Sequence, residues 1–388
     1  MAPQLQALQA MRVNSIMRGL VDTRELPGDL LWLRRTPIVP AVNGEIMARF
    51  TGRVQIADLV ADDQRAGVYS AGKWSFETNN APNLKHGQML TQEQLDLIAA
   101  IEANGGVDND PDGIWSEMEN GVLDDLLLGV RQRMEAICVA RAMDGFSYNR
   151  LGIVMDNVTW GMPSDLKVTL EVPITDHANC KIVSYILGLR RLAKVRYGIT
   201  YDRLTMSLAL FNEMTSCLEF QEKARMYLAP NVSFINLSVE NTQDMQNLAQ
   251  KVFSGMEIEL YDSRYWSQGE DGTLVSSPYQ PINKIIFSAK ANDGSRRVCD
   301  WANGVPTEVT VANILGGDTS GMIGNLPRGT RGPVGYVTGT HNPPQVTYWG
   351  VAKGWSRKHL LQETAVMTVA PDVGDDAIEE MIPVGEPF

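Results

Sequence analysis

The feature that most constrains the fold is a long amphipathic segment that begins near Ser116 and ends near Asp144. Ser116 and Glu119 form an S-x-x-E capping box, typical of a helix N-terminus, and Asp144-Gly145 is a typical stop signal. Between them, apolar side chains recur every three or four residues and share one stripe of a helix. The stripe contains Trp115, Met118, Val122, Leu126, Val130, Met134 and Ile137. At about 1.5 Å per residue this helix spans roughly 40 Å, which indicates a structural spine rather than a site.

A long β-hairpin is predicted before this helix. Residues 45–59 have the pattern of one strand, residues 62–67 that of a turn, and residues 68–78 that of a returning strand. Trp74 and Phe76 fall on the same face of the returning strand. The hairpin has no obvious local core, and a two-stranded hairpin alone is marginal in water. We therefore expect Trp74 and Phe76 to contact another subunit.

The N-terminal 40 residues are typical of an extended arm, because apolar residues are scattered among arginines, and Pro27, Pro37 and Pro40 interrupt regular structure. Residues 1–60 carry seven Arg and no Lys against five acids, whereas residues 86–130 carry ten acids and no base. Such polarised charge suits a subunit that meets copies of itself. Arg34, Arg35 and Arg49 are candidate contacts to a neighbour; an ordinary solvated surface is the alternative.

Strands and helices alternate from residue 168 to residue 253, which predicts a compact α/β lobe. The predicted strands are 168–174, 204–206 and 232–237, and the predicted helices run from Asp176 to Arg196, from Ser207 or Leu208 to Tyr227, and from Asn241 to Phe253. A strand at 256–261, a polar tip at 269–272 and an apolar strand at 283–287 follow. Residues 316–343, rich in Gly and Pro, are predicted to be a loop, with strands at 345–351 and 363–369 after it.

Two short motifs suggest catalysis or metal binding only weakly. The segment from Gly67 to Gly72 reads G-x-x-S-x-G, one residue longer than the G-x-S-x-G turn of serine hydrolases. Asp176, His177 and Cys180 are close in sequence, but no second ligand pair completes a metal site. A helix cap beside a buried Cys is the better interpretation.

Two further motifs also lack essential residues. The Gly-rich segment 316–321 has no G-K-[ST] ending and is not a phosphate-binding loop. Asp108, Asp110 and Asp112 alternate as in a calcium loop, but the Gly and Glu that such a loop requires are missing. The four histidines lie far apart in sequence. We expect no catalytic residue, no cofactor and no metal.

Composition excludes several classes of protein. Hydrophobic residues make up 44% and charged residues 21%, which is ordinary for a folded chain. No apolar run approaches the roughly 20 residues of a membrane span, and the first residues lack the pattern of a secretory signal. The net charge of −12 argues against a protein that grips nucleic acid through phosphates. Four widely spaced cysteines favour reduced, buried thiols.

One block of sequence resembles a known family. Tyr261-Asp262-Ser263-Arg264-Tyr265, then Asp271-Gly272, then Pro281-Ile282-Asn283-Lys284 is similar to a recurring block of the lambda-like major capsid proteins of tailed phages. The segment 202–207, which leads to Phe211 and a helix, and the closing strand before Pro371-Asp372 resemble two further elements of that family. The order of arm, hairpin, spine helix, α/β lobe and closing strands resembles the Hong Kong 97-type capsid fold over nearly the whole chain.

The resemblance implies an α+β fold with the named parts of that capsid type. They are an N-terminal arm (1–40), an E-loop hairpin (41–85), a P-domain with the spine helix (86–175), an A-domain (176–345), and closing P-domain strands with an acidic tail (346–388). The tail after Pro371 and the loop before Pro344 depart from the family pattern.

The function implied by the resemblance is structural. Copies would form pentamers and hexamers of an icosahedral head around double-stranded DNA, with the virion capsid as location and the host cytoplasm as place of assembly. The implied partners are the chain itself, packaged DNA bound non-specifically, a portal, a cement or decoration protein, and scaffolding supplied by a separate chain. No membrane partner is expected.

Two alternatives remain open: an encapsulin-like compartment shell and, in a different class, a β-rich hydrolase or glycan-binding module. Some members of the fold cross-link a Lys of the E-loop to a neighbour. Lys73 and Lys85 are the candidates here, but neither lies at the hairpin tip, which carries Asp62 and Asp63. We therefore expect no cross-linking.

Overall fold

The computed structural model describes residues 28–40, 46–51, 73–78, 82–89, 114–150, 153–227, 242–268, 274–289, 298–306, 331–341 and 344–369. The chain divides into two compact units, each made of three stretches of sequence. The first contains Met1–Met47, Glu77–Ile137 and Asp300–Arg357, and the second contains Ala48–Phe76, Cys138–Cys299 and Lys358–Phe388.

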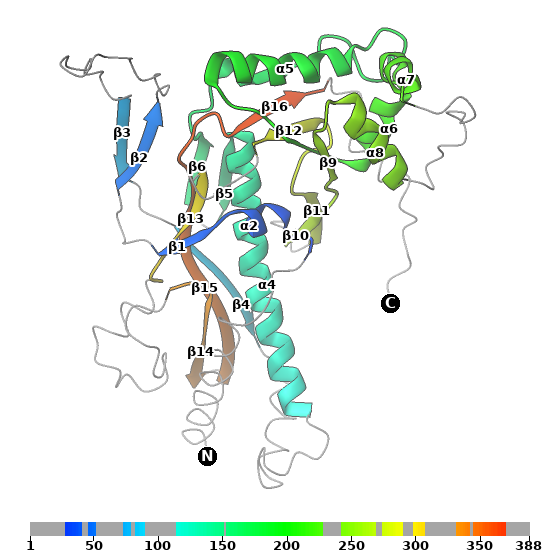
Figure 1. Ribbon diagram of the computed structural model, residues 1–388. Helices are drawn as coiled ribbons and strands as arrows, with labels where there is room; N and C mark the ends of the chain where they lie inside the picture. The colour runs from blue at the N-terminus through cyan, green and yellow to red at the C-terminus, as the bar shows by residue number, and fades with distance from the viewer. Residues whose placement is uncertain are drawn as a thin grey trace, which may run out of the picture. The chain divides into compact units, whose positions relative to one another are not determined.

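The first unit combines a five-stranded sheet with most of a 30-residue helix (Figure 1). The sheet order is β1-β13-β15-β14, and β4 also pairs with β15. Its strands are β1 (Ile38–Pro40), β4 (Asn83–Met89), β13 (Cys299–Gly304), β14 (Val334–His341) and β15 (Pro344–Lys358). Strand β1 runs parallel to β13, whereas β14 and β4 run antiparallel to β15.

The predicted spine helix is confirmed as α4 (Ile114–Met143). Leu126, Val130, Met134 and Ile137, the four stripe residues whose side chains are described, are each 1% exposed. The helix meets the sheet closely: a Cβ added to Gly350 of β15 would lie 3.0 Å from the Leu126 carbonyl oxygen. A larger residue than glycine would therefore separate helix and sheet at this point.

The predicted end of the spine helix is also confirmed. Asp144 has a φ of 58°, in the left-handed region, and the Gly145 N–H donates to the Ala140 carbonyl oxygen at 3.1 Å. This geometry closes the last helical turn and releases the chain into β5.

The second unit is built on a mixed five-stranded sheet in the order β7-β16-β12-β8-β9. These strands are β7 (Lys167–Thr169), β8 (Arg203–Met206), β9 (Glu257–Leu260), β12 (Lys284–Ser288) and β16 (Thr364–Thr368). Strands β7 and β16 are parallel, as are β8 and β9, and β12 runs antiparallel to both of its neighbours. A single hydrophobic core packs the helices on this sheet.

The helices of the second unit are α5 (Ile182–Tyr197), α6 (Leu208–Ser216), α7 (Leu218–Arg225) and α8 (Thr242–Val252), with a short 3-10 turn at Ser164–Leu166. In Figure 1, α5 runs along the sheet, and α6, α7 and α8 gather near β9. Separate two-stranded pairs are formed by β5 (Phe146–Arg150) with β6 (Ile153–Val158), β10 (Arg264–Gln268) with β11 (Leu274–Pro278), and β2 (Ile46–Thr51) with β3 (Lys73–Thr78).

Two predicted helices need correction. The helix expected from Asp176 begins at Ile182, because Asp176 instead closes a turn in which its carboxylate accepts the Asn179 N–H and side-chain amide. The helix expected from Ser207 to Tyr227 is two helices separated at Cys217, whose ψ of 136° is extended. Ser207 is the N-cap of α6, since its hydroxyl accepts the Leu210 N–H at 3.2 Å.

The strand predictions were partly wrong. The predicted loop at 316–343 contains β14, which pairs over its whole length with β15. The glycines of this segment disfavour a strand, but pairing with β15 supplies the backbone hydrogen bonds that stabilise one. The strand expected at 168–174 is observed only as the shorter β7 (Lys167–Thr169). Strands β4, β5, β6 and β13 were not predicted. The expected strand at 232–237 and turn at 62–67 lie outside the described residues.

Candidate assembly and stability sites

Part of the predicted arm is anchored within its own unit. Helix α2 (Leu31–Arg35) buries Trp32 and Leu33, and its first turn meets the buried Glu135 carboxylate of α4. The Trp32 N–H donates to Glu135 Oε1 at 2.9 Å, and the Leu33 N–H donates to Oε2 at 2.5 Å. The carboxylate thus satisfies two N–H groups that a helix start leaves unpaired.

The candidate contact residues lie on the three elements α2, β2 and β3. Arg34 is exposed on α2, and the Arg35 guanidinium lies 5.9 Å from the centre of the Trp32 ring. Arg49 lies on β2, and Trp74 and Phe76 lie on β3. The pairing of β2 with β3 supports the expected hairpin, but the side chains on both strands lie outside the described residues, so their contacts remain a prediction.

The hairpin β10–β11 carries exposed apolar side chains. Trp266 is 65% exposed and Leu274 69% exposed, and the register Trp266–Ser276 and Gln268–Leu274 places both on one face. Tyr265 projects from the other face, and its ring centre lies 5.0 Å from that of Tyr279. The resemblance to a capsid family identified this block in the sequence but did not indicate that Trp266 and Leu274 are exposed. The pattern that could have indicated it is one apolar residue on each side of a polar tip.

A cluster of buried charges surrounds the end of α4 in the second unit. Arg141 and Glu363 form an ion pair with a 3.0 Å separation and are 2% and 3% exposed. Lys358 is fully buried and donates to the Thr364 hydroxyl at 3.0 Å, and that hydroxyl donates to the Ala142 carbonyl oxygen. Sequence spacing gives no sign of this cluster, because its members come from residues more than 200 positions apart.

Asp144 belongs to the same region. Its carboxylate accepts the Trp160 N–H at 2.7 Å and pairs with the Lys167 ammonium at 2.8 Å. The residue that ends the spine helix therefore also fixes the strand pair that follows it. Burial lowers the pKa of Lys358 to about 8, although the negative charges of Glu363 and Asp144 oppose that shift. Burial likewise raises the pKa of the Cys299 thiol to about 12.

The low pKa of Lys358 predicts a pH-dependent stability. Because an unfolded Lys has a pKa of 10.5, the unfolded chain binds more protons than the folded chain between pH 8 and 10.5, so this group makes stability rise with pH in that window. Lys358→Met removes the contribution. Between pH 7 and pH 10 the wild type should therefore gain stability that Lys358→Met does not gain. The free energy of unfolding of the variant, measured relative to that of the wild type, should fall by up to about 3 kcal/mol over this range.

Urea titrations at both pH values measure this difference. The other titrating groups are present in both chains and cancel in the subtraction. A difference that does not change with pH would show that Lys358 keeps an ordinary pKa in the folded chain.

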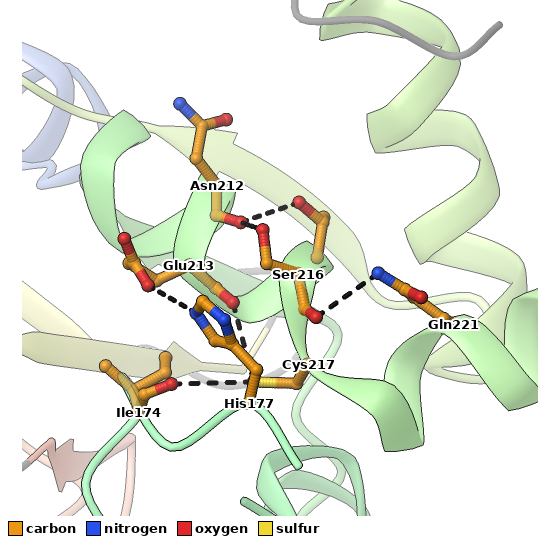
Figure 2. A network of polar contacts seen from close by, with 8 residues as sticks. Ile174, His177, Asn212, Glu213, Ser216, Cys217 and Gln221 are labelled. Carbon is orange, nitrogen blue, oxygen red and sulfur yellow. Dashed lines mark hydrogen bonds and ion pairs between the residues drawn. The ribbon is translucent and has the colours of Figure 1, made fainter. Parts of the chain in front are cut away.

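The motif at Asp176, His177 and Cys180 does not form a metal site. The His177 Nε2 atom lies 2.7 Å from Glu213 Oε2, and both side chains are more than a third exposed (Figure 2). Among the described residues, no group of three or more His, Cys, Asp and Glu side chains is arranged to hold a metal ion. The G-x-x-S-x-G, Gly-rich and alternating-Asp motifs lie outside the described residues.

No helix in the described part of the chain has the length and hydropathy to cross a membrane. Lys85, one of the two candidate cross-linking lysines, lies on β4 with its ammonium 4.3 Å from the centre of the Trp349 ring. This cation–π contact holds Lys85 against its own unit.

Comparison with known proteins identifies the fold through structure alone. No protein-family model and no curated protein sequence matches the chain. A phage-related protein of Bordetella bronchiseptica RB50 is 10% identical with a TM-score of 0.50, covering 92% of this chain and 96% of that one. A protein described as a capsid protein of an E. coli CFT073 prophage is 10% identical with a TM-score of 0.53, covering 92% and 99%.

An encapsulin complex from Synechococcus elongatus PCC 7942 is also similar, at 11% identity and a TM-score of 0.42, which is too low to support an assignment. The two stronger likenesses extend over nearly the full length of every chain compared. Together with the spine helix and the mixed sheet, they establish that this chain has an α+β fold of the Hong Kong 97 phage-capsid type.

Proposed function

We propose that the chain is a structural major capsid protein that self-assembles as pentamers and hexamers into the icosahedral head around phage double-stranded DNA. The observation that carries this proposal is the full-length likeness to the protein described as a prophage capsid protein, with a TM-score of 0.53. We further propose that the chain is not an enzyme and that it belongs to the lambda-like branch.

The surface and the charge of the chain support a shell role. Trp266 and Leu274 expose apolar surface on one face of a hairpin, which is typical of protein contact sites, and a second copy of the chain is the partner that a shell supplies. The net charge of −12 suits a container for DNA, because an acidic lining does not retain phosphates through counterion release.

We propose the parts of the subunit by analogy with the fold. They are an arm at 1–40, an E-loop at 41–85, a P-domain at 86–175, an A-domain at 176–345, and closing strands with a tail at 346–388. The proposed contacts between subunits are Trp74, Phe76, Arg34, Arg35 and Arg49. A portal, a scaffolding chain, a cement protein and packaged DNA are proposed partners, and the virion capsid, assembled in the host cytoplasm, is the proposed location.

Size and contents of the purified protein test the proposal. A capsid protein should elute in the megadalton range, show polyhedra in negative stain and, in particles from the native source, protect double-stranded DNA from nuclease. An encapsulin-like shell would give polyhedra that contain protein cargo instead of DNA. A hydrolase or glycan-binding module would elute as a small oligomer and overturn the proposal.

The hairpin β2–β3 provides a mutational test of subunit contacts. Trp74→Ala with Phe76→Ala should leave a folded, soluble subunit whose shells fail to form or dissociate on warming, because burying each aromatic side chain contributes about 1.5–3 kcal/mol. Ser75→Ala with Glu77→Ala changes the opposite face of the same strand and should leave assembly intact. Differential scanning calorimetry and electron microscopy of both variants give the comparison. Insolubility of the aromatic variant as a free subunit would contradict the prediction.

Mature particles should contain no covalent links between subunits. An isopeptide bond needs a neutral, desolvated amine near a proton-accepting acid, and Lys85 is instead engaged with Trp349. Boiled particles should give one band near 42.8 kDa on a denaturing gel. A ladder of multimers that disappears in Lys73→Ala or Lys85→Ala would reverse this prediction.

A further inference from the structure

Two of the four cysteines lie together in the core of the second unit. Cys180 ends the turn that precedes α5, and Cys217 is the residue between α6 and α7. Their side chains are 1% and 0% exposed, and both thiols are free. The function proposed above uses neither of them.

Contacts on both sides of the cysteines fix their proximity. The Leu218 N–H donates to the His177 carbonyl oxygen at 2.8 Å. The Glu219 carboxylate accepts the Val183 N–H at 2.9 Å and the Ser184 N–H at 3.2 Å. Residues 217–219 therefore run beside residues 177–184, and this alignment brings Cys217 against Cys180.

A hydrogen bond between the two side chains is the largest influence on the pKa of each thiol. The Cys217 sulfur also lies 3.4 Å from the Glu213 carbonyl oxygen and 3.9 Å from the Ile174 carbonyl oxygen, the latter contact drawn in Figure 2. Closure to a disulfide requires the sulfurs to approach to about 2.05 Å. The hydrogen bonds that align residues 217–219 with residues 177–184 hold the two buried side chains next to each other for that movement.

The two thiols differ in acidity. The hydrogen bond from Cys217 lowers the pKa of Cys180, although burial acts in the opposite direction, and the same hydrogen bond together with burial raises the pKa of Cys217. The charged groups that face the pair are His177, Glu213 and Glu219. Because the thiolate is the reactive form, Cys180 is the nucleophile of the pair and Cys217 the resolving thiol.

We propose that Cys180 and Cys217 are a redox modification site that forms a reversible intramolecular disulfide on exposure to hydrogen peroxide. The Cys180 thiolate attacks one peroxide oxygen, the O–O bond breaks, and Cys180 becomes a sulfenic acid while one water leaves. The Cys217 sulfur then attacks the Cys180 sulfur, the S–S bond forms, and a second water leaves. The two thiols give up two electrons and hydrogen peroxide accepts them, so the reaction is balanced.

The disulfide would join the start of α5 to the junction of α6 and α7. Cross-linking restricts the unfolded chain, so the oxidised protein should be the more stable form. Cytosolic thiols stay reduced and disulfides persist outside cells, so a protein that leaves a cell would gain this link after folding. The chemistry depends on the thiol pair alone and not on the shell function proposed above.

Peptide mapping of the purified full-length protein tests the site. The folded protein is treated with hydrogen peroxide, denatured, alkylated and digested with trypsin without reduction. Alkylatable thiols should fall from four to two, and tryptic peptides 168–181 and 204–223 should be recovered as one linked species. Dithiothreitol should restore all four thiols, and the oxidised protein should unfold at a higher denaturant concentration than the reduced protein.

Three variants make the test specific. Cys180→Ser and Cys217→Ser should abolish the linked species and the shift in unfolding, whereas Cys138→Ser should retain both. Mapping of the wild type decides the outcome even if a variant fails to fold. Three results would overturn the proposal. The first is sulfinic acid on Cys180 with Cys217 still free, and the second is a disulfide that involves Cys138 or Cys299. The third is a folded protein that does not react with peroxide although its denatured form does.

Discussion

Replacement of Arg141 by Met is expected to lower the free energy of unfolding by about 3–5 kcal/mol. Arg141 and Glu363 are both nearly inaccessible, and their ion pair has a separation of 3.0 Å. Removal of the guanidinium leaves the Glu363 carboxylate charged, buried and without the cation that contacts it. Urea unfolding at neutral pH, followed by circular dichroism, measures the loss.

A second substitution distinguishes a buried unpaired charge from a simple loss of packing. Arg141→Met combined with Glu363→Leu removes both charges, so the double variant should be more stable than Arg141→Met alone. Arg203→Met is the matched control, because Arg203 and Glu257 form an ion pair of the same 3.0 Å separation in the same unit, and Glu257 is 56% exposed. The control should lose no more than about 1 kcal/mol. Equal losses for Arg141→Met and Arg203→Met would contradict the role given to the buried pair.

Replacement of Glu135 by Ala is expected to release helix α2 from the spine helix. Glu135 accepts N–H groups of Trp32 and Leu33, and hydrogen bonds to a charged group contribute about 1.5–3 kcal/mol each. Two buried donors lose their acceptor at once, so a loss of about 3–6 kcal/mol is expected. Hydrogen exchange at the amides of Trp32 and Leu33 should accelerate, and proteases should cut within residues 28–40.

The same helix offers a control for this variant. Asp125→Ala removes an exposed acid of α4 and should change neither hydrogen exchange at α2 nor proteolysis. Glu135→Gln retains one acceptor oxygen and should have an intermediate effect. Unchanged amide protection in Glu135→Ala would show that α2 is held by burial of Trp32 and Leu33 alone.

The parts of the fold that local rules control could be predicted from the sequence. The stripe through Leu126, Val130 and Met134 predicted a buried helix face, and Asp144-Gly145 predicted its end, because periodicity and stop signals are local properties. Gly198 ends α5 in the left-handed conformation, which is the same kind of local stop signal.

The remaining features depend on partners distant in sequence. Strand β14 could not be predicted from its glycine-rich sequence, because its pairing with β15 is what stabilises it as a strand. The start of α5 depends on Glu219, which supplies the acceptor for the Val183 N–H. Burial acts to raise the pKa of Glu219, but hydrogen bonds from Lys223 and Ser184 outweigh burial and hold the pKa below its ordinary value.

The candidate sites likewise include residues that the local sequence identifies and residues that only the folded chain brings together. Arg34 and Arg35 could be selected from charge alone, but the anchoring role of Glu135 could not, because that residue lies about 100 positions from its partners. The cluster around Arg141 and Glu363 is likewise assembled only by the folded chain. Resemblance to a family supplied the fold class, which composition and periodicity alone left open.

The central claim is that copies of this chain close into a shell, and cryo-electron microscopy of the purified protein tests it most directly. The proposal predicts closed icosahedral particles in which pentamers and hexamers of the fold described above make up the shell. A homogeneous, correctly folded protein that remains a monomer or a small oligomer at high concentration, including with the scaffolding and portal chains of its source, would contradict the claim.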